Sequence, residues 1–64
     1  MKAGTVLEGN GNIYLVKEVH VDGHVVANIC AKEGQELFVV PGMTMHISCH
    51  TIGDYKIIGE AEVA

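Results

Sequence analysis

The sequence predicts a small all-β domain of five strands. Turn-forming residues recur at short, regular intervals, as GNGN (9–12), DG (22–23), KEG (32–34), PG (41–42) and GD (53–54). Segments rich in β-branched residues fill the gaps, which is typical of strands joined by tight turns. A chain of 64 residues has room for a single domain, residues 1–64, with one modest core.

The turns divide the chain into strands whose faces follow from the alternation of apolar and polar residues. The predicted strands are 3–8, 13–20, 24–31, 43–51 and 55–62. In the second strand, Ile13, Leu15 and Val19 share one face, interrupted by Lys17, and Tyr14 is expected on the opposite face. The apolar faces of the later strands are predicted to be Val25, Ala27 and Ile29, then Met43, Met45, Ile47 and Cys49, then Tyr55, Ile57 and Gly59.

The run LFVV (37–40) is ambiguous. It is expected to be a short extended piece or the end of a helical turn that starts near Ala31, and Pro41 is expected in a turn. Five strands of this length cannot cover a flat sheet, whereas closing them into a barrel buries one face and removes most open edges. The predicted fold is therefore a small five-stranded OB-fold-like barrel, with one short helical or irregular connection between strands three and four.

The charge of the chain bears on its partners. Eight acidic residues against four lysines give a net charge of −4, and arginine is absent. Electrostatic binding to a phosphate backbone is therefore expected to be weak. The acidic residues that outweigh the lysines favour solubility or docking on a basic protein surface; they include Glu8, Glu18, Glu33, Glu36, Asp54, Glu60 and Glu62.

The sequence also suggests a location. No basic segment followed by an apolar run opens the chain, and the longest apolar stretch, LFVV, is far below the roughly 20 residues of a spanning helix. Two cysteines are too few for a disulfide scaffold. We therefore expect a cytoplasmic protein with reduced thiols and no membrane partner.

The segment HISCH (46–50) looks like a metal-binding motif. On a strand, however, His46 and His50 would lie roughly 13–14 Å apart on one face, with Cys49 on the other. Because metal ligands must converge within about 2.0–2.3 Å of the ion, a polar strand face is the preferred interpretation.

The segment HVDGH (20–24) predicts a hairpin. A three-residue loop with Gly23 in the left-handed region places Val19 opposite Val25 and Leu15 opposite Ile29. His20 then lies opposite His24, and protonating both would place like charges together. His20 and His24 are the better candidate metal ligands, but no third ligand is identifiable, so neither a metal nor another cofactor is expected.

The sequence carries no pattern of an enzyme. GNGN lacks the helix and lysine of a phosphate-binding loop, and Cys49 is expected to be an inert core residue. The carboxylates are scattered over turns and strand ends. We therefore expect a non-catalytic protein.

Four segments, GTVLE (4–8), DGHVVANICAK (22–32), PGMTMHI (41–47) and GDYKIIGE (53–60), resemble the corresponding segments of bacterial translation initiation factor one. The resemblance runs over residues 4–60 and implies an OB-fold that binds RNA or the ribosomal subunit. The chain departs from the family at KEGQE (32–36), where the family is basic, and in its acidic final strand.

The resemblance also implies a binding face. The positions carried over from the family are Lys17, His24, Lys32, His46 and Lys56. Tyr14 and Phe38 are expected to stack on bases, with His20 and His50 beside them. The alternative hypothesis is an adaptor or inhibitor, of a kind found in phage genomes, that docks on a basic protein surface without binding nucleic acid. A third hypothesis is a metal-linked barrel or oligomer.

Overall fold

Tight turns separate five antiparallel strands in the computed structural model, which describes residues 1–61. The strands are β1 (Thr5–Gly9), β2 (Asn12–Val19), β3 (Val25–Glu33), β4 (Glu36–Ile47) and β5 (Lys56–Glu60). One turn of 3-10 helix, η1 (Ile52–Asp54), precedes β5. The predicted all-β class is confirmed for these residues. The predicted end of the last strand, Glu62, lies outside the described residues.

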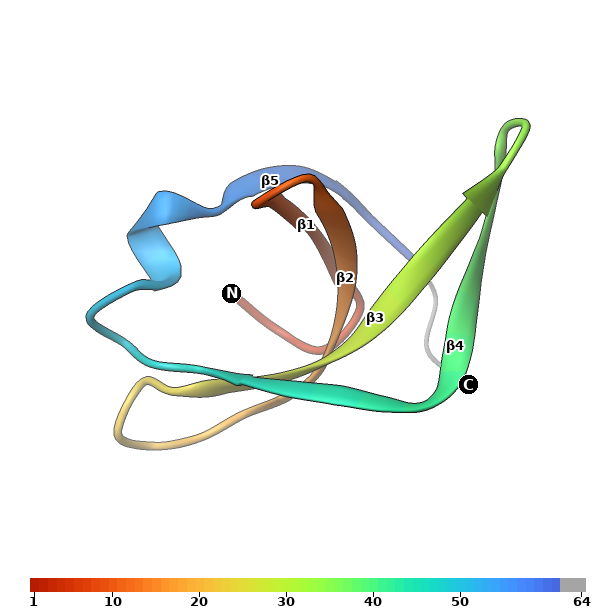
Figure 1. Ribbon diagram of the computed structural model, residues 1–64. Coiled ribbons are helices and arrows are strands. Elements are labelled where there is room, and N and C mark those ends of the chain that lie inside the picture. The colour runs from red at the N-terminus through yellow and green to blue at the C-terminus, as the bar shows by residue number, and fades with distance from the viewer. Residues whose placement is uncertain (62–64) are drawn as a thin grey trace.

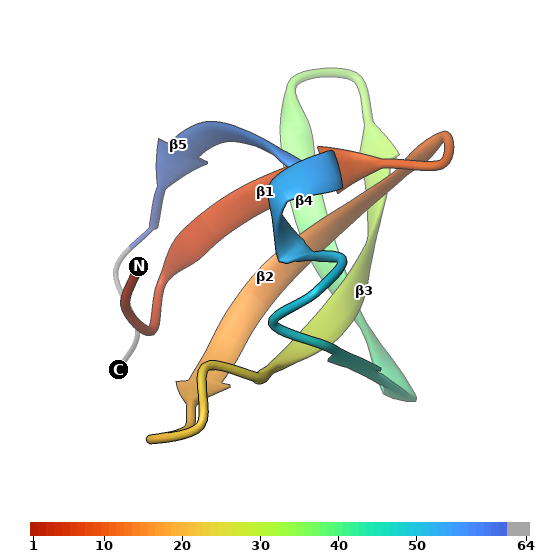
Figure 2. The same cartoon turned by 90° about the vertical axis from the view of Figure 1, so that its left-hand side faces the viewer.

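The strands form one curled sheet in the order β4-β3-β2-β1-β5 (Figures 1 and 2). Each of the first three strands pairs with the next, and η1 leads the chain from β4 to β5, which pairs with β1. Within residues 1–61, β4 and β5 are the two edges and do not pair with each other, so the sheet is open. No helix in this part of the chain is long and apolar enough to cross a membrane.

Two of the hairpins are closed by two-residue turns. Asn10 and Gly11 have φ angles of 52° and 79° and connect the paired residues Gly9 and Asn12, which is the pattern of a type I′ turn. Between β3 and β4, Gly34 has a φ of 62° and the pair is Glu33 and Glu36. The expected helical or irregular connection between strands three and four is therefore wrong, because Gly34 permits a direct turn and residues 37–39 pair with β3.

β4 is bent in its middle. Cys30 pairs with Val39 and Asn28 pairs with Thr44, so residues 40–43 bulge out opposite Ile29 alone. Pro41 was expected in a turn and instead lies in this bulge, where its missing N–H breaks no ladder hydrogen bond. Gly42 has a φ of 78°, which a residue with a side chain rarely adopts.

The core lies on the concave face of the sheet. Its buried members are Leu7, Tyr14, Val16, Val25, Ala27 and Ile47, and Ile29, Met45, Ile52 and Tyr55 pack against them. The predicted inward face of the third strand, Val25, Ala27 and Ile29, is thus confirmed. Val19 pairs with Val25 as predicted.

The predicted faces of the second strand are wrong. Tyr14 and Val16 are buried, whereas Ile13 and Leu15 are half-buried. The cause is a bulge at Lys17: Val16 pairs with Ala27 and Glu18 pairs with Val26. An extra residue reverses the alternation, so the residues in phase with Val19 beyond the bulge are Val16 and Tyr14. For the same reason Leu15 pairs with Asn28 instead of Ile29.

The faces of the last two strands are corrected in part. β4 ends at Ile47, which is buried as predicted, and the exposed Cys49 lies in the turn that follows instead of in the core. Met43 was expected to face inward but is 48% exposed, whereas Ile57 pairs with the buried Leu7 and so shares its face as predicted, yet it is 58% exposed. Both lie at the bulge or the edge of the sheet, where no further strand covers them.

Tyr55 closes one end of the core. Its ring meets the ring of Tyr14 edge to face, with centroids 5.5 Å apart. On its other side the ring lies against Gly9, where a Cβ would come within 2.6 Å of Tyr55 Cδ2. The absence of a side chain at Gly9 therefore makes room for Tyr55.

Candidate protein-interaction site

The predicted nucleic-acid-binding residues do not form one face. Tyr14 is 2% exposed and belongs to the core, so the expected role in base stacking is wrong for this residue. Lys17, Lys32 and Lys56 are exposed but lie on β2, β3 and β5, and β1 and β2 separate β5 from β3 in the sheet. The positive charges are therefore spread over the sheet.

Three histidines do come together. The rings of His20 and His24 stack with centroids 4.1 Å apart, and the ring of His46 lies 6.0 Å beyond His24. The N–H of His20 donates to the carbonyl of His24 at 2.9 Å, and Gly23 has a φ of 93°, which confirms the predicted three-residue loop. We call these residues the histidine column.

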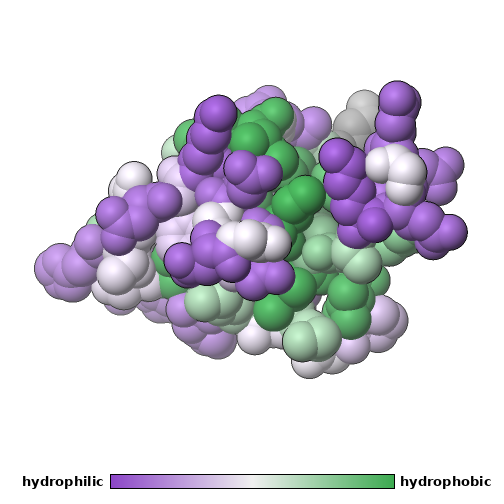
Figure 3. Space-filling view, turned by 45° about the horizontal axis from the view of Figure 1, so that its top comes forward, coloured by the Kyte–Doolittle hydropathy of each residue, from purple (hydrophilic) through white to green (hydrophobic). Residues whose placement is uncertain are grey.

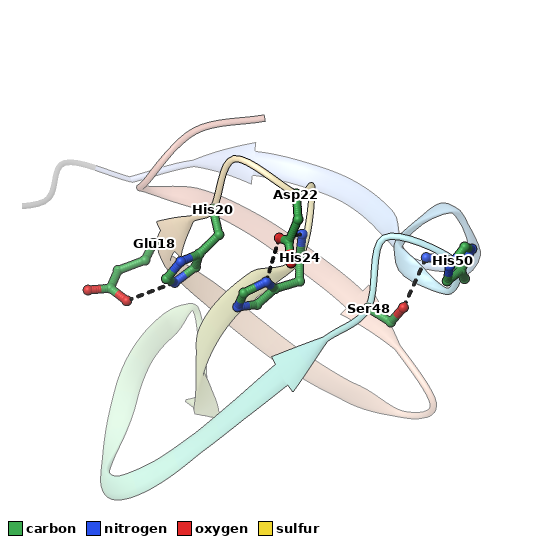
Figure 4. Close-up of polar contacts among 6 residues, drawn as sticks. All are labelled: Glu18, His20, Asp22, His24, Ser48 and His50. Atoms are coloured by element: carbon green, nitrogen blue, oxygen red, sulfur yellow. Dashed lines mark hydrogen bonds and ion pairs between the residues drawn. The ribbon is translucent and has the colours of Figure 1, made fainter.

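Two carboxylates contact two of the three histidines of the column, His20 and His24 (Figure 4). His24 Nδ1 lies 2.6 Å from Asp22 Oδ1, which also accepts the N–H of His24 at 3.0 Å. His20 Nε2 lies 3.3 Å from Glu18 Oε2. The backbone and side-chain hydrogen bonds from His24 lower the pKa of Asp22. Because a carboxylate only accepts, Nδ1 of His24 is the nitrogen that donates.

The column also covers an apolar residue. Val26 pairs with Glu18 on β2 and with His46 on β4, so the three residues form one row on the convex face. Val26 is only 6% exposed although it lies on the face away from the core. We therefore infer that the histidine column packs on the convex face of the sheet, beside Val26.

His50 is separate from these histidines (Figure 4). It lies in the turn that follows β4, where its N–H donates to Ser48 Oγ at 3.1 Å. The predicted strand continued through His50, but Thr51 and Ile52 donate to the carbonyl of Ser48 and close a turn instead. Within residues 1–61, no group of three or more His, Cys, Asp or Glu side chains is arranged to hold a metal ion.

The two cysteines have different surroundings. Cys49 is exposed, whereas Cys30 is half-buried on β3. Burial raises the pKa of the Cys30 thiol. A raised pKa disfavours the thiolate, which is the reactive form, so Cys30 is poorly suited to be a nucleophile.

Among residues 1–61, the longest run of exposed large apolar side chains lies at the end of the β3–β4 hairpin. Every residue from 31 to 39 is exposed, and we call this segment the hairpin arm. It projects away from the curled part of the sheet (Figure 1). Three consecutive apolar side chains lie on it: Leu37, Phe38 and Val39 are 42%, 45% and 42% exposed.

The arm presents apolar side chains on both of its faces. Phe38 pairs with Ala31, whereas Leu37 and Val39 pair with Lys32 and Cys30. Since neighbouring residues on a strand point to opposite faces, Phe38 faces one way and Leu37 and Val39 face the other. Figure 3 shows apolar atoms reaching the surface in the middle of the molecule, between hydrophilic groups on either side.

The tip of the arm carries a pair of like charges. Glu33 and Glu36 are directly opposite each other across the hairpin. The ion pairs formed within residues 1–61 involve Lys2, His20 and His24 and neither of these glutamates. Like charges in this arrangement are destabilising, so the pair does not serve the stability of the hairpin.

Sequence reasoning placed Phe38 and Lys32 among the binding residues but missed the arm that holds them. The signal is present in the sequence, because Gly34 followed by one residue between β-branched runs is typical of a two-residue hairpin turn. The residues of this arm are therefore the candidate site that the structure adds.

Comparison with known proteins gives no relative of this chain: no family model, no curated protein and no solved structure matches it.

Proposed function

We propose that this chain is a non-catalytic protein-binding module that docks through the hairpin arm. The observation that carries the proposal is the run Leu37–Val39, three adjacent apolar side chains left exposed along an edge strand. Exposed apolar surface of this kind marks interaction sites. Full burial of such a side chain is worth about 1.5–3 kcal/mol, so covering the exposed part of each is worth about 1 kcal/mol.

Charge favours a protein over a nucleic acid as the partner. The net charge of −4 and the opposed Glu33 and Glu36 on the arm repel phosphates and attract a basic surface. The residues described enclose no pocket. A flat contact with a macromolecule is therefore the mode of binding that suits this surface.

We propose that the curled sheet is a small, partly open barrel. In a Greek key, the pattern of the OB-fold, the fourth strand returns to lie beside the first. Here the fourth strand pairs with the third and β5 returns to β1. This order is an antiparallel meander with β5 returned to β1, and it departs from the Greek key of an OB-fold.

Capture from a cell lysate tests the function. The full chain, immobilised through its N-terminus, is expected to retain a basic protein both with and without nuclease treatment. Val39→Ser on the arm is expected to reduce capture severalfold, whereas the matched control Val21→Ser changes a fully exposed loop residue and leaves it unchanged. Retention that disappears on nuclease treatment contradicts the proposal.

RNA is the second candidate partner, in line with the resemblance to initiation factor one. The observation that favours it is Phe38, an exposed aromatic ring on the arm. Aromatic stacking on bases is worth about 1–3 kcal/mol per base. Titration of labelled single-stranded RNA and of ribosomal small subunits at low salt tests this candidate, and saturable binding that Phe38→Ser abolishes supports it.

A further inference from the structure

We propose that the hairpin arm binds an extended segment of its partner, which carries Lys or Arg beside a short apolar run and adds a strand to the edge at β4. This inference rests on the proposed function and names the chemistry of the partner. Three features of the arm lead to it: a free strand edge, apolar side chains on both faces, and an unbalanced pair of acids at the tip.

The free edge supplies the hydrogen bonds. β4 is an edge strand along its whole length, so alternate backbone groups on its outer side have no partner strand within residues 1–61. An extended peptide can pair with such an edge, and main-chain hydrogen bonds then give affinity with little dependence on sequence. Pro41 has no N–H and lies in the bulge formed by residues 40–43, so the usable edge runs from Glu36 to the start of the bulge at Val40.

The apolar side chains of the arm determine which residues of the partner segment are apolar. A strand added beside β4 places its residues next to Phe38 on one face and next to Leu37 and Val39 on the other. Both faces are then covered by apolar contacts. The incoming segment is therefore expected to carry consecutive apolar residues, because an alternating pattern would set polar side chains against one of these faces.

The acids at the tip set the charge of the partner. Glu33 and Glu36 face each other across the hairpin and form no ion pair in residues 1–61. A Lys or Arg at the end of the incoming strand would lie beside Glu36 on β4, with Glu33 one strand further away on β3, and its charge would offset their repulsion. The partner segment is thus basic at the end that reaches the turn at Gly34.

A second copy of this chain does not fit the same surface. β4 carries Glu36 and no lysine or arginine, so pairing Glu36–Val40 with itself brings no cation to the tip. Such a dimer would also bring together two chains that each carry a net charge of −4. A single-stranded RNA offers Phe38 a base to stack on but places phosphates near the two glutamates. A basic strand is the one occupant that suits all three features.

Three labelled peptides test the inference with the full chain: Lys-Val-Ile-Val-Lys, its acidic counterpart Glu-Val-Ile-Val-Glu, and Lys-Val-Pro-Val-Lys, which lacks the central N–H. Fluorescence anisotropy is expected to show the first peptide binding with a Kd below about 1 mM. The acidic and proline peptides are each expected to bind at least severalfold more weakly. Amide NMR shifts are expected to concentrate in residues 36–40.

Variants of the chain separate the contributions. In the double variant Glu33→Gln with Glu36→Gln, the affinity for the basic peptide is expected to fall by about two- to fivefold for each charge removed at low salt. The same replacement is expected to have little effect on affinity at 1 M salt. Val39→Ser is expected to weaken it further, whereas Val21→Ser leaves binding unchanged. Circular dichroism checks that each variant keeps its β-sheet.

The outcomes distinguish the inference from the proposed function. If the proline peptide binds as well as the first, or no peptide binds below about 1 mM, strand addition is excluded; equal binding of the acidic peptide excludes the role of Glu33 and Glu36. A chain that still captures a protein from lysate in those cases keeps the proposed function. Concentration-dependent dimerisation that Val39→Ser abolishes would assign the edge to a second copy of the chain. RNA that shifts the same amide signals would assign the edge to RNA.

Discussion

The core and the hairpin arm contain similar side chains that differ in burial. Leu7 and Tyr14 lie in the core, at the end of the sheet that Tyr55 closes, and Leu37 and Phe38 lie on the arm. The first two are 0% and 2% exposed, and the second two are 42% and 45% exposed. The cause is the number of neighbouring strands. Tyr14 has Leu7 on one side and Ile29 on the other, whereas Phe38 pairs with Ala31 and has no strand of residues 1–61 on its outer side. Side chains of the same chemistry are buried and stabilise the domain in one place, and they are left exposed in the other.

The largest effect is expected from shortening a leucine in each region. Leu7→Ala removes fully buried methyl groups from a small core and is expected to lower the free energy of unfolding by about 2–5 kcal/mol. Leu37→Ala is expected to change it by no more than about 0.5 kcal/mol, because the side chain lies at the surface. Urea unfolding followed by circular dichroism measures both. Similar losses in the two variants would mean that the arm belongs to the folding core.

A smaller loss is expected at Gly9, where the closed end is most tightly packed. In Gly9→Ala the new Cβ would lie 2.6 Å from Tyr55 Cδ2 and displace the ring from Tyr14. Overpacking of this kind costs about 1–3 kcal/mol. The matched control is Gly59→Ala, which meets open space on β5. Thermal unfolding compares the two, and equal midpoints would contradict the role of Gly9.

A similar or smaller loss is expected at the loop that sets the histidine column. Gly23 has a φ of 93°, and a Cβ there would lie 3.0 Å from the Cβ of Cys49. Gly23→Ala is expected to cost about 1–3 kcal/mol and to separate His20 from His24. Histidine ring NMR shifts report the separation. If they keep their wild-type values, the loop does not depend on the glycine.

The smallest effect is expected from pH. The hydrogen bonds from His24 lower the pKa of Asp22 from 3.8 in the folded protein. A carboxyl whose pKa is lowered on folding stabilises the protein above pH 3.8, and that contribution is lost as the pH falls through its folded value. Asp22→Asn is therefore expected to flatten the dependence of the melting temperature on pH below 4. Leu37→Ala on the arm leaves that dependence unchanged, and a parallel curve for Asp22→Asn would contradict the assignment.

Local signals predicted much of the fold and part of the site. Glycine turns predicted the first two hairpins, and the loop at HVDGH correctly placed His20 beside His24, because turn geometry determines register over short distances. The bulge at Lys17 was seen only as a break in alternation. Counting through it as if the strand were regular put Tyr14 on the wrong face.

The hairpin arm was missed for a different reason. The run at 37–40 is short and wholly apolar, and such a run fits a buried strand or a helical turn equally well by period. Its exposure depends on which strand lies beside it, and that is a property of the topology. His46 joins His24 through the pairing of β3 with β4, which the sequence leaves equally open.

The bulge at Pro41 and Gly42 has a consequence for how the protein behaves when it is concentrated. An open apolar edge strand can recruit further copies and grow into amyloid-like fibrils, and natural proteins interrupt such edges with proline, charge and bulges. Pro41 and the bulge cut the edge of β4 into two short pieces, and Glu36 puts a charge at the start of the first. The bulge is therefore expected to act as a gatekeeper against aggregation, because each exposed piece of the edge is short.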